Sequence, residues 1–287
     1  MFSVEQWRSK APNRGIWLLD TGSKVLFFAM LFLIGRWDIY SYYLRFIVPV
    51  LFLFIVVKSY FQVKHLPWGL SSTNTVEKFS IGIRLMVALI FGFFVVSALK
   101  GYSYPTNFIH LSSPLKNGTY YVGHGGSSTQ INYHNSHPSQ AFALDILKLN
   151  RIGIRANGLA PKDLNQYEIY GETIYSPCEG KIIKVVDGLK ELEPNQMNNQ
   201  TKNYRKKNPS GNSVVIQCKG VEITIAHMIP KSIKVKQGQQ VRDGMAIGKV
   251  GNSGNSSEPH LHIHAEKNGK GIPVLIDGSF LKRNSLF

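Results

Sequence analysis

Residues 258–264 read Glu258-Pro259-His260-Leu261-His262-Ile263-His264, with a histidine at every second position after the proline. On a β-strand, alternate side chains share one face and stand about 6 to 7 Å apart. Imidazoles held at this spacing can bind one divalent metal and leave a neighbouring histidine free to move protons. The stretch therefore predicts a strand that carries a hydrolytic metal site.

The sequence around this stretch is typical of a β domain. Short runs of β-branched residues bounded by turn residues recur at 180–186, 213–217 and 221–226. The segment 234–250 adds glycines where a strand must turn sharply. Because no amphipathic helix of comparable length competes, we expect an all-β C-terminal domain, an antiparallel sandwich or barrel with a core of its own.

Two polar stretches border or interrupt this β pattern. Residues 101–122 are rich in Pro, Asn, Gly and Ser, so we predict a linker ahead of a folded domain at 123–287. Residues 189–210 are rich in Asn, Gln and Lys, as expected of a flexible insertion or of the wall of a binding groove. Cys178 and Cys218 either pair in an oxidising compartment or are two small buried side chains.

Residues 1–100 predict a membrane-spanning region. The run 79–99 is apolar apart from Arg84 and is long enough to cross a hydrocarbon core of about 30 Å. Two shorter apolar runs, 25–35 and 46–57, reach spanning length with flanking aromatic residues that suit the membrane interface. We therefore expect about three helices, at roughly 18–40, 42–60 and 79–99, with one re-entrant hairpin from the two short runs as the alternative.

Basic residues predict the orientation of these helices. Lysines and arginines precede the first run and lie between the second and third runs, while Arg36 and Arg45 stand between the first two. Since cytoplasmic loops carry the excess of positive charge, three spans place the C-terminal domain outside the cytoplasm. The net charge of +16 suits an anionic partner such as membrane lipid or a wall polymer. Nucleic acid is not expected, because the sequence has no zinc-finger spacing, aromatic recognition motif or helix-turn-helix pattern.

The nine histidines include several candidates for a metal site. A catalytic zinc takes three His or carboxylate ligands and keeps an open position for water, whose pKa falls to about 7. Most candidates in the predicted β domain form three clusters: His134 and His137 ahead of Asp145, His227 at the end of a strand, and the triplet around His262. A lone histidine at a strand end is usually a half-buried polar side chain, so the prediction depends on the combination.

The blocks around these residues resemble the lysostaphin-type, or LytM-like, zinc metallopeptidases, which cleave peptide cross-links in bacterial peptidoglycan. The resemblance extends over about 123–265 and rests on the order and content of these blocks: Ala143-Leu144-Asp145-Ile146, Ser176-Pro177-Cys178-Glu179-Gly180-Lys181-Ile182-Ile183, Ile225-Ala226-His227-Met228, the turn units at 238–248, and Gly251-Asn252-Ser253-Gly254-Asn255 leading to His262. The membrane region lies outside it. The resemblance implies a duplicated-hybrid-motif-like β fold, a Zn²⁺ cofactor and a peptidoglycan peptide as substrate.

Carried over residue by residue, the resemblance implies that Asp145 and His262 bind the zinc and that His227 and His260 are the catalytic pair. A carboxylate and neutral imidazoles suit zinc. One histidine beside the bound water can take its proton and later deliver a proton to the leaving amine, while the other stabilises the oxyanion of the tetrahedral intermediate. His264 shares the strand face but is not a ligand in the family, so we expect it to hydrogen-bond or pack beside the site.

The first ligand departs from the family pattern. The family places a histidine four residues before the aspartate, where this chain has Ala141. The ligand must therefore come from further upstream, through a loop that folds back. We favour His134 over His137, because the residues just before His134 resemble a variant of the family with an upstream ligand. More remote candidates are His124 and His110.

Three functions are compatible with these patterns, and we expect the first. It is a zinc metalloendopeptidase in the bacterial cell membrane, multi-pass, with lipid around its N-terminal helices and its β domain extracytoplasmic. The second is a non-catalytic module of the same fold that binds wall material or activates a partner hydrolase, which the displaced first histidine favours. The third is a phosphocarrier, suggested by the block 176–183 and the paired histidines, which requires a cytoplasmic location and no zinc.

Overall fold

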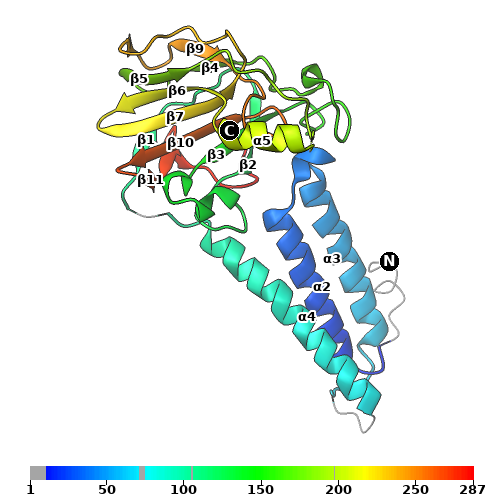
Figure 1. Cartoon of the computed structure of the whole chain (residues 1–287). Coiled ribbons are helices and arrows are strands. Elements are labelled where there is room, and N and C mark those ends of the chain that lie inside the picture. The colour runs from blue at the N-terminus through cyan, green and yellow to red at the C-terminus, as the bar shows by residue number, and fades with distance from the viewer. Residues whose placement is uncertain (1–10, 71–74, 105, 197) are drawn as a thin grey trace. The chain divides into compact units, whose positions relative to one another are not determined.

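The computed structural model describes residues 11–70, 75–104, 106–196 and 198–287 (Figure 1). The chain divides into two compact units. The helical unit comprises Met1–Gly35 and Tyr43–Leu99, and the β unit comprises Arg36–Tyr42 and Lys100–Phe287. The connection between the first two apolar helices is therefore part of the β unit.

In the described part of the helical unit there are three apolar helices, namely α2 (Arg14–Ile34), α3 (Leu44–Val63) and α4 (Thr75–Lys100). Each is long and apolar enough to cross a membrane, by length and composition. The prediction of three N-terminal helices is confirmed, and α2 and α3 reach 21 and 20 residues. Large apolar side chains on α3 and α4 are exposed, as expected for surfaces that a membrane covers, among them Val50, Phe54, Leu89 and Phe93.

One ion pair joins two of these helices. Arg84, which interrupts the apolar run of α4, donates from Nε to Oδ1 of Asp20 on α2 at 2.6 Å. Charged side chains within a membrane helix are costly and are usually paired with one another. The pairing explains how α4 accommodates an arginine inside its predicted span.

The β unit is built on an eight-stranded sheet in which every pairing is antiparallel. Along the sheet the order is β2-β3-β10-β7-β6-β5-β8, and β11 pairs with β10. The strands are β2 (Thr119–His124), β3 (Leu144–Leu149), β5 (Gly180–Val186), β6 (Asn212–Cys218), β7 (Val221–Met228), β8 (Gln240–Val241), β10 (Leu261–Lys267) and β11 (Lys270–Ile272). Lys219 and Gly220 join β6 to β7 with φ of 50° and 78°, the positive values that a two-residue hairpin turn needs.

Two small sheets and a short α-helix also belong to the β unit. Strand β1 (Ile109–Leu111) pairs in parallel with β12 (Val274–Ile276), which also pairs with β13 (Ser279–Phe280). The second small sheet consists of β4 (Thr173–Tyr175) and β9 (Ala246–Lys249). The polar stretch 189–210 contains a short helix, α5 (Asn199–Lys207).

The stretch 101–122 differs from the predicted linker. It contains β1 and the start of β2, and it belongs to the β unit. Its strand signal is weak because β1 has only three residues, and its partner β12 lies near the other end of the chain. The pairing partner, which local sequence does not reveal, orders this stretch.

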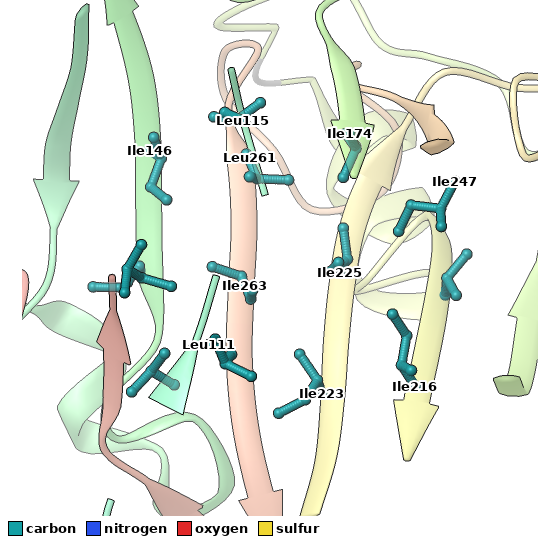
Figure 2. Packing of buried hydrophobic residues seen from close by; sticks show 14 of the residues in the cluster. Leu111, Leu115, Ile146, Ile174, Ile216, Ile223, Ile225, Ile247, Leu261 and Ile263 are labelled. Atoms are coloured by element: carbon teal, nitrogen blue, oxygen red, sulfur yellow. The ribbon is translucent and has the colours of Figure 1, made fainter. Parts of the chain in front are cut away.

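The core lies between the large sheet and the small sheets. Figure 2 shows Ile146, Ile263 and Ile225 from β3, β10 and β7 packing with residues of the small sheets, including Ile174 and Ile247. Each fully buried isoleucine contributes about 1.5 to 3 kcal/mol. This burial fixes which face of the large sheet is apolar, and strand alternation turns the polar side chains of the same strands to the opposite face. The prediction that an antiparallel all-β domain follows the apolar helices in the chain is confirmed.

Cys178 and Cys218 form a disulfide bond, so the first of the two predicted alternatives applies. Cys218 ends β6, and Cys178 lies just ahead of the neighbouring strand β5. Their Cα atoms are 6.4 Å apart, a separation that a disulfide can bridge.

Candidate metal centre

Strand register brings two of the predicted ligands together. Asp145 on β3 lies directly opposite His262 on β10 in the antiparallel ladder. Their neighbours Leu144 and Ile263 belong to the core, so alternation turns Asp145 and His262 to the other face of the sheet. His262 Nδ1 lies 2.9 Å from Oδ1 of Asp145.

A folded-back loop brings His134 to the same carboxylate. His134 lies in the 3-10 helix η2 (Tyr133–Ser136), and its Nε2 is 3.0 Å from each carboxylate oxygen of Asp145. The buried Asn132 holds this loop, because its side-chain oxygen accepts from the amide of His134 and its Nδ2 donates to nearby backbone carbonyls. His137, the predicted alternative, is exposed.

His134, Asp145 and His262 form a buried group of three donors. One ligand atom from each lies within 4.8 Å of the other two. Burial by itself raises the pKa of Asp145, but the neighbouring His260 and His134, together with hydrogen bonds from ring nitrogens, hold that pKa well below its usual value. Burial lowers the pKa of His262. An ionised carboxylate beside a neutral imidazole is the protonation state that a divalent metal requires of its ligands.

A bulge in β7 turns His227 toward this group. Ile225 and Met228 both belong to the core, so regular alternation from Ile225 would bury His227 on the core side as well. The ladder between β6 and β7 shifts register across this point, and His227 has a φ of 62°. A left-handed residue at a strand bulge redirects its side chain at a cost in strain, a device common beside active sites. The ring centroids of His227 and His260 are 4.9 Å apart.

Backbone carbonyls fix the orientation of both rings. His227 Nδ1 lies 2.8 Å from the carbonyl oxygen of Ser253, and His260 Nδ1 lies 2.8 Å from that of Glu258. Because a carbonyl only accepts, each Nδ1 carries the proton, and in the neutral ring Nε2 carries the lone pair. Burial holds the pKa of His227 well below its usual value, so this ring is neutral at pH 7. His260 Nε2 has no hydrogen-bond partner among the described residues.

His264 extends the row of histidines on β10. Its Nδ1 lies 2.9 Å from Nε2 of His262, the ring nitrogen that does not face Asp145. Burial lowers the pKa of His264 to about 3, so its ring is neutral and can accept a hydrogen bond. Of the remote candidates, His124 accepts a hydrogen bond at Nδ1 from Arg283, and His110 is exposed.

A pocket opens beside these residues. Its walls include Asp145 and His260 together with side chains to which the sequence assigned no role, namely Arg36, Tyr133, Arg205 and Glu258. The Tyr133 ring lies against His134 with centroids 3.9 Å apart, and burial raises its pKa. Tyr133 directly precedes His134, and Glu258 lies two residues before His260. Their places in the sequence could therefore have suggested that they belong to the site. Arg36 adjoins none of them, and only its position in a short connection between apolar runs stands out.

Residues 166–273 match the family model described as Peptidase family M23. This chain carries an M23 domain. The predicted resemblance to the lysostaphin-type family is therefore confirmed. The matched part of the M23 domain contains His227, His260 and His262 and begins after His134 and Asp145.

Solved structures similar to this chain include three peptidases. A candidate M23 peptidase from Pseudomonas aeruginosa is 21% identical, with 59% of this chain and 50% of that chain covered and a TM-score of 0.32. Lysostaphin is 20% identical, with 44% and 36% covered and a TM-score of 0.27. A zinc containing peptidase from Vibrio cholerae is 19% identical, with 45% and 48% covered and a TM-score of 0.26. This chain thus spans half or less of the length of these relatives.

Proposed function

We propose that this M23 protein is a membrane-anchored zinc metalloendopeptidase that hydrolyses amide bonds in peptidoglycan peptides. The observation that carries the proposal is the buried group of His134, Asp145 and His262, with His227 and His260 beside it. Two imidazoles and a carboxylate fit zinc, which when bound lowers the pKa of a water ligand to about 7 and polarises a carbonyl.

The other two histidines supply the proton transfers. His260, whose Nε2 has no hydrogen-bond partner among the described residues, is the proposed proton carrier. A neutral Nε2 can take a proton from the attacking water, and the ring that has gained it can protonate the leaving amine. With Nδ1 held on a backbone carbonyl, His227 also presents a neutral Nε2, which can accept a proton.

The membrane anchor and its orientation are part of the proposal. The β unit contains both Arg36–Tyr42, after α2, and Lys100–Phe287, from the end of α4 onward. If all three helices cross the membrane, the ends of α2 and α4 emerge on the same side, as a unit with both segments requires. The Cys178–Cys218 bond suits an oxidising compartment, so we place the M23 domain outside the cytoplasm of a bacterium. The phosphocarrier function, which needs a cytoplasmic location, is not supported.

The substrate class follows from the family and the charge. The net charge of +16 favours an anionic polymer such as the bacterial wall over a neutral one. The pocket beside Asp145 and His260 also has Arg205 on its walls. A peptide that carries carboxylates, as wall peptides do, suits these surroundings.

The test uses the full chain, purified in detergent and loaded with zinc. The wild type should bind one zinc per chain at His134, Asp145 and His262, and it should release new amino groups from peptidoglycan, with products identified by mass spectrometry. His260→Ala should keep the zinc and lose at least about 100-fold of the rate, the lower range for a general acid–base group. His110→Ala, at an exposed histidine outside the site, is the matched control and should match the wild type.

Two results would reject the proposed enzymatic function. A chain that stays metal-free after zinc loading has no such centre. A chain that binds zinc, and in which His260→Ala changes neither product release nor the effect of the protein on cells, is a non-catalytic module of the same fold.

A further inference from the structure

We propose that Arg36 is a positioning residue of the peptidase site, acting through Glu258 on His260. The inference rests on the proposed function, because it concerns the same proton carrier. Arg36 follows the end of α2, and Glu258 is 222 residues away along the chain. The connection between two predicted membrane helices would therefore contribute a residue that supports catalysis in the M23 domain.

The segment Arg36–Tyr42 is hydrogen-bonded to the rest of the β unit. The amide of Arg155 donates to the carbonyl of Asp38 at 3.1 Å, and the amide of Tyr42 donates to the carbonyl of Gly153 at 2.8 Å. Gly153 has a φ of 77°, and a Cβ atom there would lie 2.9 Å from the nitrogen of Tyr42. Glycine is therefore required at this close approach. These contacts hold the backbone within the 3-10 helix η1 (Trp37–Ile39) and just after it.

Two arginines and two carboxylates form a closed ion network at this junction. Arg36 donates from Nε and Nη2 to the two oxygens of Asp38, at 2.8 and 2.7 Å, and from Nη2 to Oε1 of Glu258 at 2.8 Å. Arg155 donates from Nε to Oε2 of Glu258 at 2.8 Å and lies 3.5 Å from Asp38. Asp38, Arg155 and Glu258 are buried. Because the charges balance, removal of one arginine leaves two buried carboxylates to share the other.

Glu258 transmits this constraint to His260. Each of its carboxylate oxygens is held by a different arginine, so the side chain has little freedom to turn. Its backbone carbonyl accepts from Nδ1 of His260 at 2.8 Å and from the hydroxyl of Ser256 at 2.8 Å. The hydrogen bond at Nδ1 sets the tautomer and the orientation of the ring, and it thereby directs the lone pair of Nε2. Release of Glu258 should let the ring turn.

A direct contact between Arg36 and substrate is the competing role, because Arg36 lines the same pocket as His260. Kinetics separate the two. Loss of a substrate contact present in both ground and transition states raises KM, whereas misplacement of a proton carrier lowers kcat.

The experiment compares variants of the zinc-loaded full chain in detergent on a soluble wall peptide. Arg36→Gln should lower kcat about tenfold or more, since a small misplacement of a reacting group can cost as much as 100-fold. KM and zinc content should stay at the wild-type values. Arg242→Gln, which removes an exposed arginine of the same unit, should leave kcat unchanged. Glu258→Gln should resemble Arg36→Gln, and the double variant should lose no more than either, because the two residues act in one network.

A second readout does not depend on activity. In nitrogen-15 NMR of the histidine rings, wild-type His260 should show the tautomer protonated at Nδ1, and Arg36→Gln should shift or broaden that signal. If Arg36→Gln does not fold, Arg36→Lys replaces it in the comparison. Lysine keeps the positive charge but cannot make the bidentate hydrogen bonds of arginine, so the His260 signal should change in the same way but by less. If the wild type hydrolyses no wall peptide, the proposed function fails while the NMR comparison still tests the positioning.

Three outcomes would overturn the positioning role. They are a kcat for Arg36→Gln within twofold of the Arg242→Gln control, a raised KM with kcat unchanged, and a His260 ring signal identical to that of the wild type.

Discussion

The site has a sheet floor and a loop rim, and the two are held in place by different forces. The sheet floor consists of Asp145, His227, His262 and His264, which strand ladders and core packing position. The loop rim consists of Arg36, Asn132, His134, Glu258 and His260. These residues are positioned by hydrogen bonds within loops and by ion pairs between distant segments. The floor is thus fixed by backbone pairing shared by many residues. On the rim, replacement of a single polar side chain should change zinc affinity, hydrolysis or the free energy of unfolding.

The sharpest test of this difference is the rim ligand. His134→Ala should reduce zinc affinity by more than the roughly 100-fold that loss of an outer-shell partner can cost, because it removes a proposed ligand itself. Hydrolysis should fall with it. His137→Ala, at the exposed alternative, should bind zinc as the wild type does. Isothermal titration with zinc measures both, and the reverse order of the two variants would assign the ligand to His137.

A smaller effect is expected from the floor at His264. If His262 held zinc through Nδ1, the Nε2–H of that ring would donate to Nδ1 of His264, which lies 2.9 Å away. His264→Phe removes the acceptor, and such outer-shell losses lower metal affinity about 10- to 100-fold. His264→Gln restores an oxygen acceptor and should recover part of the affinity. Equal affinities for His264→Phe and the wild type, measured by competition with a chelator, would show that His264 only packs.

The smallest effect is expected at the support of the rim. Asn132→Ala leaves the amide of His134 and buried carbonyls without their partner, which costs about 1 to 3 kcal/mol. The free energy of unfolding of the metal-free chain should fall by that amount, and zinc affinity should fall less than in His264→Phe. Asn203→Ala, at an exposed position on α5, is the control for denaturant melts. Unchanged unfolding of Asn132→Ala would show that the loop is held by other contacts.

Much of the floor could be predicted from the sequence, and most of the rim could not. Alternation in 258–264 is a local property, so it indicated which face His262 occupies before any partner strand was known. The position of His227 depends on a bulge in β7, which a strand pattern does not reveal. His134 was one of several upstream candidates, because the loop that returns it to Asp145 depends on hydrogen bonds from Asn132 to the carbonyls of Gly126 and Ala143.

The sequence by itself determined the three apolar helices, the β class of the C-terminal domain and the family blocks around the histidines, because each is written in the periodicity or order of neighbouring residues. Only the tertiary structure decided that Arg36–Tyr42 belongs to the β unit, that Cys178 pairs with Cys218, and that His134 meets Asp145. The physical reason is that hydrogen bonds, ion pairs and disulfides act over a few ångströms in space, and only folding brings these partners that close.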